Sequence, residues 1–559
     1  MKKNNWNIKF SGQGMSANEI ITQVMHNRGI DCKDINDFLY PREDWLYPSA
    51  ALLNIHKAAG LVLHSRRPLV YADTDTDGCS AAAIMIRWFN RYLETYFPDI
   101  PYIGAEYYIN EGKDHGIQDY FFMSNESIID TVIVVDSIND DPKYYLDLLN
   151  KGKNVIVLDH HIVPESIKQI DHPQFALVSS ALEYPNPSLS GSGVVWKFCK
   201  YLDYLLSTDF ADTYIDLAAC GVIADVCSVG TDSMENRAIC NLAFRNIVNP
   251  ALLRLSKGTV FDSTFIGFTV GPLINAANRM NRNDLALSLF LADNKEDIDN
   301  ILKALEEVKA EQKAIVESLL PELQKQEEYN KYSNCKIFFI EGYNTLTGLL
   351  ATKLCEQYQR PCLVLHDKGD YYAGSMRAVG VPDFSALVNQ SGFAECMGHE
   401  NSAGIVIPKF DFHIFRSYIE EVLAPLPFVD GYDVDVELER AQVSPFLLSE
   451  FKKIDRISGA NFSPIKVCID NVNSFEVKEL SKGKHISVNT NDLKFLYWNF
   501  KDWDKVDKTS TFSAIGSLSE NTFFGKTNNQ MLMEDYYFSK KETVFEHPHT
   551  TIYREDIIF

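Results

Sequence analysis

Metal-binding and proton-transferring side chains follow three short apolar runs in the first half of the chain. The runs are PLVYA at 68–72, TVIVV at 131–135 and NVIVL at 154–158. The side chains that come next are Asp73, Asp75 and Asp77, then Asp136, and finally Asp159, His160 and His161. So many carboxylates cannot converge without a counterion, because their mutual repulsion would drive some of them to become protonated. The pattern therefore predicts a site for divalent metal ions, provided that the three runs lie side by side.

The donor types indicate which ions would bind. Carboxylates and imidazoles without a thiolate favour Mn²⁺, with Mg²⁺ as the alternative, over a structural zinc ion. Each piece taken alone has a structural interpretation, because an Asp-x-Asp after a strand is often a turn or a helix N-cap, and a His-His pair is often incidental. Three such segments in order, each directly after a β-branched apolar run, favour the metal site.

The elements that must position these residues are the strands of a parallel sheet. Continuous apolar runs of this length are typical of strands that are buried on both faces. Residues 80–93 (SAAAIMIRWFNRYL) have apolar positions spaced for a helix that packs on that sheet. In open α/β sheets, ligands bind beyond the carboxyl ends of the strands. The predicted fold class is therefore α/β, with the acidic residues gathered at one edge of a parallel sheet.

The sequence predicts five parts along the chain. They are a helical N-terminal extension at 1–50, an α/β domain at 51–292, a connecting helix at 293–330, a smaller α/β domain at 331–425, and an all-β domain at 426–559. Within the connecting helix, Pro321 indicates a kink or an end. In the last part, short strands separated by polar turns are typical of a small barrel or sandwich.

The composition narrows the class of protein. The chain has 559 residues, with 53 Lys and Arg against 76 Asp and Glu, so its formal net charge is −23. This charge argues against a broad basic surface for duplex nucleic acid, but it leaves room for a local basic channel. Eleven cysteines without a C-x-x-C motif indicate reduced thiols. Because the sequence has no apolar leader and no apolar run of about 18 residues, we expect a cytoplasmic protein without a membrane partner.

Four ordered segments resemble the motifs of the DHH phosphoesterase superfamily: DTDTDG at 73–78, VVDSI at 134–138, LDHH at 158–161 and GVIADV at 221–226. Further segments resemble the RecJ type of single-strand-specific 5′→3′ exonuclease, namely LSGSGVVWKF at 189–198, GPLINAANRMNRNDLAL at 271–287, GSMRAV at 374–379 and GHENSAG at 398–404. The resemblance implies a DHH catalytic domain, a DHH-associated substrate-binding domain at 331–425 and an OB-fold-like nucleic-acid-binding domain at 426–559. In that last domain, the aromatic candidates for stacking on bases are Phe495, Tyr497, Trp498, Phe500, Trp503, Phe523 and Phe524.

The resemblance implies a two-metal centre. Its ligands would be Asp73, Asp75, Asp77, Asp136, His160 and Asp225, with Asp136 bridging two divalent ions and Asp73 the outermost of the set. His161 would face the scissile phosphate, so the implied catalytic residues are Asp77, Asp136 and His161. Two bound ions activate a water molecule and stabilise the charge on the phosphoryl oxygens. Judged from the residues alone, Asp225 would be a helix cap, and it gains its role only from the resemblance.

The resemblance also implies a site for the 5′-terminal phosphate of the substrate. Its residues would be Arg279, Gly374, Ser375, Arg377, Gly398, His399 and His115. Glycine lets the backbone approach a phosphate, while serine and arginine donate hydrogen bonds to it. Taken singly, each arginine would instead be a surface salt-bridge partner. Leu273, Asn278 and Met397 stand where the family has an arginine and two glycines, and none of them is an implied metal ligand.

The implied function is the degradation of single-stranded DNA from its 5′ end to 5′-mononucleotides, in recombination or repair. The implied partners are a 5′-phosphorylated DNA strand and either a single-strand-binding protein or a helicase, and the family fold implies a monomer. Two alternatives stay open: a hydrolase of short oligoribonucleotides or cyclic dinucleotides, and a catalytically silent replication scaffold. Residues 426–559 argue against the first alternative, and the filled ligand positions argue against the second.

Overall fold

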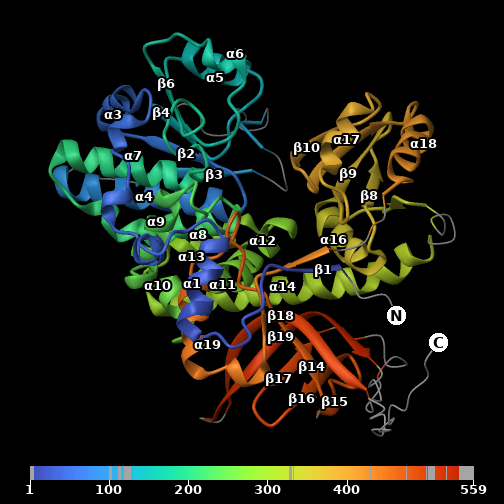
Figure 1. The fold of residues 1–559 in the computed structure, drawn as a ribbon. Helices are drawn as coiled ribbons and strands as arrows, with labels where there is room; N and C mark the ends of the chain where they lie inside the picture. The colour runs from blue at the N-terminus through green and yellow to red at the C-terminus, as the bar shows by residue number, and fades with distance from the viewer. Residues whose placement is uncertain are drawn as a thin grey trace, which may run out of the picture. The chain divides into compact units, whose positions relative to one another are not determined.

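The structure is a computed structural model of the chain (Figure 1). It describes residues 5–99, 104–110, 115–118, 128–326, 330, 333–426, 428, 431–473, 475–498, 500, 506, 510–523 and 526–539. The chain divides into two compact units. The larger unit comprises Ile30–Asp430 and Asp455–Ser463, and the smaller unit comprises Met1–Gly29, Gly431–Ile454 and Pro464–Phe559.

The larger unit contains a five-stranded parallel sheet with the strand order β3-β2-β4-β5-β6. Its strands are β2 (Pro68–Ala72), β3 (Glu106–Ile109), β4 (Thr131–Val135), β5 (Asn154–Asp159) and β6 (Phe175–Ser179). Every residue of β2, β4 and β6 is buried, in agreement with the continuous apolar runs. The three runs that precede the acidic residues are therefore neighbouring strands, which confirms the predicted parallel sheet.

Helices pack on this sheet and fix the positions of the loops that follow its strands. The helices α4 (Thr76–Tyr96) and α7 (Gly191–Leu206) contact the strands and each other, and both contact α8 (Ile215–Ala224). Tyr145 and Leu148 of α5 (Lys143–Asn150) join a core with alternate residues of the strands, Val132 and Val134 among them. The predicted helix at 80–93 lies within α4, which begins before it at Thr76.

Short helices complete this first α/β part of the larger unit, and a long helix leads out of it. The shorter ones are α2 (Ile35–Leu39), α3 (Ile55–His64), α6 (Glu165–Lys168), α9 (Met234–Arg245), α10 (Pro250–Ser256), α11 (Ser263–Phe265), α12 (Gly271–Arg279) and α13 (Asn283–Leu291). The long helix α14 (Lys295–Gln324) contains Pro321. Of the two alternatives predicted for Pro321, a kink or an end, the end is wrong, because α14 continues to Gln324. Leu323, beyond the proline, is anchored in a hydrophobic core with Phe338 and Val364.

A second, smaller sheet follows in the same unit, with the strand order β10-β11-β9-β8-β7. Its strands are β7 (Lys336–Phe339), β8 (Cys362–Asp367), β9 (Tyr371–Arg377), β10 (Glu395–His399) and β11 (Ser402–Pro408). The pair β7–β8 is parallel and the other pairs are antiparallel. The accompanying helices are α16 (Thr347–Tyr358), α17 (Phe384–Gln390) and α18 (Phe412–Leu423).

The smaller unit is built mainly of strands. A seven-stranded sheet has the order β13-β14-β18-β19-β17-β16-β15. Its strands are β13 (Val436–Leu438), β14 (Val467–Val472), β15 (Glu476–Leu480), β16 (His485–Asn489), β17 (Lys494–Tyr497), β18 (Thr511–Phe523) and β19 (Lys526–Ser539). A further parallel pair joins β1 (Asn5–Ile8) to β12 (Gly431–Val434).

Two elements of the smaller unit differ from the sequence-based prediction. The N-terminal extension is not wholly helical, because β1 precedes α1 (Ala17–Asn27) and finds its pairing partner in β12, far along the chain. The region after 426 is not wholly β, because it contains α19 (Pro445–Asp455). Leu447, Phe451 and Ile454 are buried at helical spacing in α19, a pattern that the sequence already shows.

The aromatic candidates of the smaller unit divide by exposure. Phe495 and Phe500 are buried and belong to the packing of the sheet, whereas the side chain of Trp498 is half exposed. Of the other candidates, Trp503 and Phe524 lie outside the described residues, as does the side chain of Phe523. Among the candidates whose side chains the structure describes, Trp498 is therefore the most exposed.

Two further expectations concern the chain as a whole. All eleven cysteines lie within the described ranges; none is paired in a disulfide, and only Cys32 is exposed. Across the described part of the chain, no helix combines the length and the apolar character that a membrane crossing requires.

Candidate metal centre

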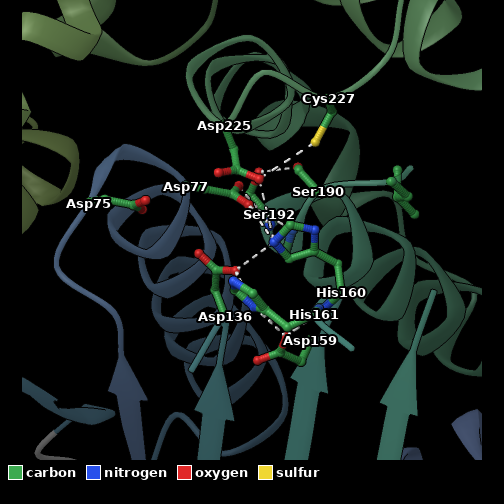
Figure 2. Close-up of polar contacts among 12 residues, drawn as sticks. Asp75, Asp77, Asp136, Asp159, His160, His161, Ser190, Ser192, Asp225 and Cys227 are labelled. Atoms are coloured by element: carbon green, nitrogen blue, oxygen red, sulfur yellow. Dashed lines mark hydrogen bonds and ion pairs between the residues drawn. The ribbon is translucent and has the colours of Figure 1, made fainter. Parts of the chain in front are cut away.

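The parallel sheet brings the acidic segments together at the carboxyl ends of its strands. Ala72 pairs with Val135, which in turn pairs with Leu158, so β2, β4 and β5 end at the same level. The residues that follow, Asp73, Asp136 and the pair His160 and His161, therefore lie at one edge of the sheet. Figure 2 shows Asp136, His160 and His161 at this edge. This juxtaposition is the one that the spacing of the apolar runs predicts.

Asp75 and Asp77 are held by the start of α4 and by its neighbours. Asp75 is the N-cap of α4, and its side chain accepts a hydrogen bond of 2.9 Å from the backbone N–H of Gly78. Asp77 accepts backbone N–H groups from Gly191 (2.7 Å) and Ser192 (3.0 Å) at the start of α7. A Cβ atom on Gly221 of α8 would lie 1.8 Å from Oδ1 of Asp77, so only glycine leaves room for this carboxylate.

Asp136 is buried at the centre of the cluster in a strained conformation. Its φ of +53° lies in the left-handed region, which is uncommon for a residue other than glycine. Only 2% of Asp136 is exposed, and its Oδ1 accepts no hydrogen bond from any residue that the structure describes. That oxygen lies 3.2 Å from Nε2 of His160 and 3.9 Å from Nδ1 of His161. The strain and the unsatisfied oxygen both indicate a functional position.

Nε2 of His160 lies close to the carboxylates of several aspartates. The nitrogen lies 3.5 Å from Oδ2 of Asp225, which caps the C-terminus of α8, and 4.0 Å from Oδ2 of Asp77. Among the described residues it has no hydrogen-bond partner, although it is buried. The structure therefore brings Asp225 into the cluster, as the motif resemblance implies.

His161 is oriented by Asp159, the first residue of the DHH segment. Nδ1 of His161 lies 2.8 Å from Oδ1 of Asp159, which also accepts the backbone N–H groups of both histidines. Burial acts against the charged imidazole, but the hydrogen bond and charge of Asp159 raise the pKa of His161 to about 9. The pKa of Asp159 is in turn held below its usual range by His161, although burial opposes this. The ring of His115 contacts that of His161, with centroids 4.9 Å apart.

The electrostatics of the cluster call for a cation. Burial, followed by the charges of neighbouring aspartates, raises the pKa of Asp136 and that of Asp75 well above the ordinary value of 3.8. Three overlapping groups have ligand atoms within 4.8 Å of one another: Asp73 with Asp75 and Asp136, Asp136 with His160 and His161, and His160 with Asp225 and Cys227. Unsatisfied ligand atoms on Asp136 and His160 complete a donor set that fits divalent ions.

The implied phosphate-binding arginines lie beside this cluster. Arg279, at the end of α12, and Arg377, at the end of β9, line a pocket of about 280 Å³ together with Asp73 and Asp75. Burial lowers the pKa of both guanidinium groups, and the charge of Arg279 lowers that of Arg377 further. Two cations held close together in this way are suited to an anion that replaces their lost hydration.

Of the other implied substrate-binding residues, some line a pocket and one has a side chain that the structure does not describe. Gly374, Ser375 and Arg377 line a neighbouring pocket of about 670 Å³. A Cβ atom on Gly374 would lie 2.0 Å from the carbonyl oxygen of Val364, so the pairing of β9 with β8 also requires a glycine at this position. Gly398 has a φ of +134° at the β10–β11 turn. The side chain of His399 lies outside the described residues.

Sequence reasoning missed one ligand-bearing residue at the centre, Cys227. Its thiol is buried, and Sγ lies 3.8 Å from Oδ2 of Asp225 (Figure 2). The signal that could have revealed it is the Asp-x-Cys spacing directly after the last motif. Between the two residues, Val226 has a φ of +56°, which is rare for a β-branched residue. This conformation leaves Val226 exposed while its two neighbours point into the cluster.

Comparisons with known proteins agree with this fold and site. The sequence model of the DHH family N-terminal domain matches residues 67–222, and that of the RecJ OB domain matches residues 434–535. A putative single-strand DNA-specific exonuclease, yorK of Bacillus phage SPbeta, is 25% identical over 94% of this chain and 97% of its own. The single-stranded-DNA-specific exonuclease RecJ of Bacillus subtilis is 23% identical over 94% of this chain and 69% of its own.

A solved structure extends the likeness to the whole fold. RecJ of Thermus thermophilus, in complex with Mn²⁺, has a TM-score of 0.74 at 21% identity and covers 97% of this chain and 81% of its own. Residues 67–222, with the sheet and its DHH segment, thus match the N-terminal domain of the DHH family. With the OB match and the relatives along most of the chain, the protein resembles a divergent member of the RecJ type.

Proposed function

We propose that this protein is a divalent-metal-dependent exonuclease that degrades single-stranded DNA from its 5′ end to 5′-mononucleotides. The observation that carries the proposal is the convergence of Asp75, Asp77, Asp136, His160 and Asp225 at one edge of the sheet, beside a pocket lined by two arginines. The relatives named as single-strand-specific exonucleases support the choice of substrate. Recombination or repair is the process that we propose for it.

The residues of the site would have different roles in phosphodiester hydrolysis. Asp75, Asp77, Asp136, His160 and Asp225, with Asp73 adjoining, would hold divalent ions. Such ions would supply hydroxide near neutral pH and offset charge on the phosphoryl oxygens. His161 is fixed through Nδ1 by Asp159, so its opposite nitrogen is available to the substrate. As a cation, His161 can donate a hydrogen bond to a phosphoryl oxygen or a proton to the leaving 3′-oxygen.

The arginine pocket supports cleavage close to a chain end. Asp73 and Asp75 line the same pocket as Arg279 and Arg377, so an anion bound by the arginines would lie next to the metal ligands. A 5′-terminal phosphate held there would place the first phosphodiester bond of the strand at the metal centre. Short products released from the 5′ end are the expected result of this geometry.

The test is digestion of single strands labelled at the 5′ or the 3′ end, with Mn²⁺ present. We expect mononucleotides from the 5′ end, and a loss of at least about 100-fold in rate for both Asp136→Asn and His160→Gln, because each removes a ligand atom. His64→Ala changes an exposed histidine of the same unit and should retain full activity.

Other outcomes would contradict the proposal in distinct ways. Full activity in both ligand variants would refute the metal assignment. Cleavage of dinucleotides but not of long strands would favour the oligoribonucleotide or cyclic-dinucleotide hydrolase. A wild-type protein that binds strands without cleaving any of these substrates would favour the silent scaffold.

A further inference from the structure

Cys227 adds sulfur to a centre that otherwise offers oxygen and nitrogen. The ligand atoms of Cys227, Asp225 and His160 all lie within 4.8 Å of one another. The thiol is 7% exposed, and in Figure 2 its sulfur points towards the carboxylate of Asp225. The sulfur of Cys227 therefore lies among the atoms that could bind a metal ion.

The spacing of these atoms fits a single small ion. In tetrahedral zinc sites the metal lies about 2.0–2.2 Å from nitrogen and oxygen and about 2.3 Å from sulfur, which places two donors about 3.3–3.6 Å apart. Here Nε2 of His160 lies 3.5 Å from Oδ2 of Asp225, and Sγ of Cys227 lies 3.8 Å from the same oxygen. These two separations are within about 0.2 Å of those of donors on one ion. The third separation, from Sγ to Nε2, is within 4.8 Å.

A second observation points to a ligand at the same place. Oδ1 of Asp136 is buried, accepts no hydrogen bond from any described residue, and lies 3.2 Å from Nε2 of His160. This separation is again that of two donors on one ion. Asp136 thus offers a fourth donor beside His160, and a cation there would coordinate an oxygen that accepts no hydrogen bond from the described residues.

We propose that Cys227, His160 and Asp225, with Asp136 adjoining, form a sulfur-containing metal subsite that selects thiophilic divalent ions of the Zn²⁺ and Cd²⁺ class. This inference rests on the proposed metal centre, and at this subsite it replaces the preference for Mn²⁺ that carboxylates and imidazoles alone would give. A thiolate favours softer ions than carboxylate and imidazole do, so the subsite would prefer them to Mn²⁺ or Mg²⁺. On binding, a sulfur–metal bond replaces the S–H bond of Cys227, and the proton passes to the solvent.

The experiment uses the full chain, stripped of metal by a chelator and titrated with Co²⁺ as a spectroscopic probe. We expect a thiolate-to-cobalt charge-transfer band in the near ultraviolet, which disappears in Cys227→Ser and Cys227→Ala. Zn²⁺ affinity should fall by about 10- to 100-fold in these variants, while Mn²⁺ affinity changes much less. Cys220→Ala, a buried cysteine of α8 outside the cluster, should keep both the band and the affinity.

Equilibrium dialysis in parallel distinguishes the ways in which the inference can fail. Bound Co²⁺ without the band, or a band that persists in Cys227→Ala, would overturn the sulfur subsite and leave the proposed nuclease intact. No bound Co²⁺ at all would overturn both proposals. Cadmium NMR of the wild-type protein provides a measurement that needs no variant to fold: a resonance in the range of oxygen and nitrogen ligands alone would refute ligation by sulfur.

Discussion

Asp136 is unfavourable for folding and lies at the centre of the proposed metal site. It combines a left-handed backbone, almost complete burial and an oxygen without a hydrogen bond from any described residue. Each of these features costs stability in the metal-free protein. The cost is offset when a cation neutralises the carboxylate, so the stability of the fold and the occupancy of the site should be linked.

The pH dependence of this cost has a definite sign. Burial and the neighbouring aspartates raise the pKa of Asp136 above its ordinary value, so the folded state binds the proton more tightly than the unfolded state does. The destabilisation is therefore absent below the ordinary pKa of an aspartate and grows as the pH rises through the raised one. The metal-free protein therefore carries more of this cost at pH 8 than at pH 5.

Replacement of Asp136 by asparagine should therefore stabilise the metal-free protein. We expect Asp136→Asn to raise the free energy of unfolding by about 1–2 kcal/mol at pH 8, with less effect at pH 5, because the charge is removed and asparagine tolerates a positive φ. Denaturant unfolding with and without Mn²⁺ measures this. At 100 times Kd, Mn²⁺ should stabilise the wild type by about 2.7 kcal/mol and the variant much less.

The matched control is the same substitution at a buried aspartate outside the centre. Asp216 accepts backbone N–H groups from Leu217, Val248 and Asn249, so Asp216→Asn should destabilise the protein at every pH where it is folded. If Asp136→Asn were also destabilising at pH 8, the account of Asp136 as an uncompensated charge would be wrong.

At the scale of elements, the close approach of α8 to α4 depends on the absence of a side chain. A Cβ atom on Gly221 would collide with Asp77 and with the hydroxyl of Ser192. Helix propensity alone would favour alanine at a helical glycine by about 1 kcal/mol. The two effects have opposite signs, so one substitution can show which of them prevails.

We expect Gly221→Ala to displace Asp77 and to lower Mn²⁺ affinity by at least about 10-fold, despite its better helix propensity. Calorimetric titration with Mn²⁺ measures the affinity. Gly60→Ala in α3 is the control, because no described atom outside its own helix turn lies within 4 Å of the added Cβ; it should stabilise the fold by up to about 1 kcal/mol and leave the affinity unchanged. Equal affinities in the two variants would show that Asp77 needs no glycine opposite it.

The elements also show what the sequence could and could not predict. Strands β2, β4 and β5 and the residues after them were predictable because burial on both faces leaves continuous apolar runs and parallel strands end together. Asp225 and Cys227 were not predictable from such patterns, because they reach the cluster from the end of a helix whose packing is a long-range property. The pairing of β1 with β12 was not predictable for the same reason, because β12 lies more than 400 residues after β1 in the sequence.

At the scale of the whole molecule, the net charge of −23 limits how the protein can bind DNA. Part of that charge lies in the aspartate cluster, where bound ions would offset it. The cationic groups that the structure places next to the cluster are few, Arg279 and Arg377 foremost. An acidic protein with a small basic site should bind a single strand through few phosphates and should bind duplex DNA poorly.

The salt dependence of strand binding tests this. With about two to four phosphates neutralised, the logarithm of the association constant should fall with the logarithm of the salt concentration with a slope of about −1 to −3, because each phosphate contributes about −0.7 for single strands. Fluorescence anisotropy with a labelled strand and Ca²⁺ in place of Mn²⁺ measures the slope. A slope steeper than about −5 would reveal an extended basic surface that the described residues do not suggest.

The pairing of β1 with β12 has a consequence for the order in which the chain folds during synthesis. Residues 5–8 leave the ribosome first, yet their partners at 431–434 follow only after about 420 further residues, or roughly 20–85 s at typical elongation rates. Asp535, which accepts a hydrogen bond from the indole N–H of Trp6, is synthesised later still. The smaller unit therefore cannot be completed until the larger one has been synthesised, and its first strand must stay unpaired in the meantime as a segment that chaperones can bind.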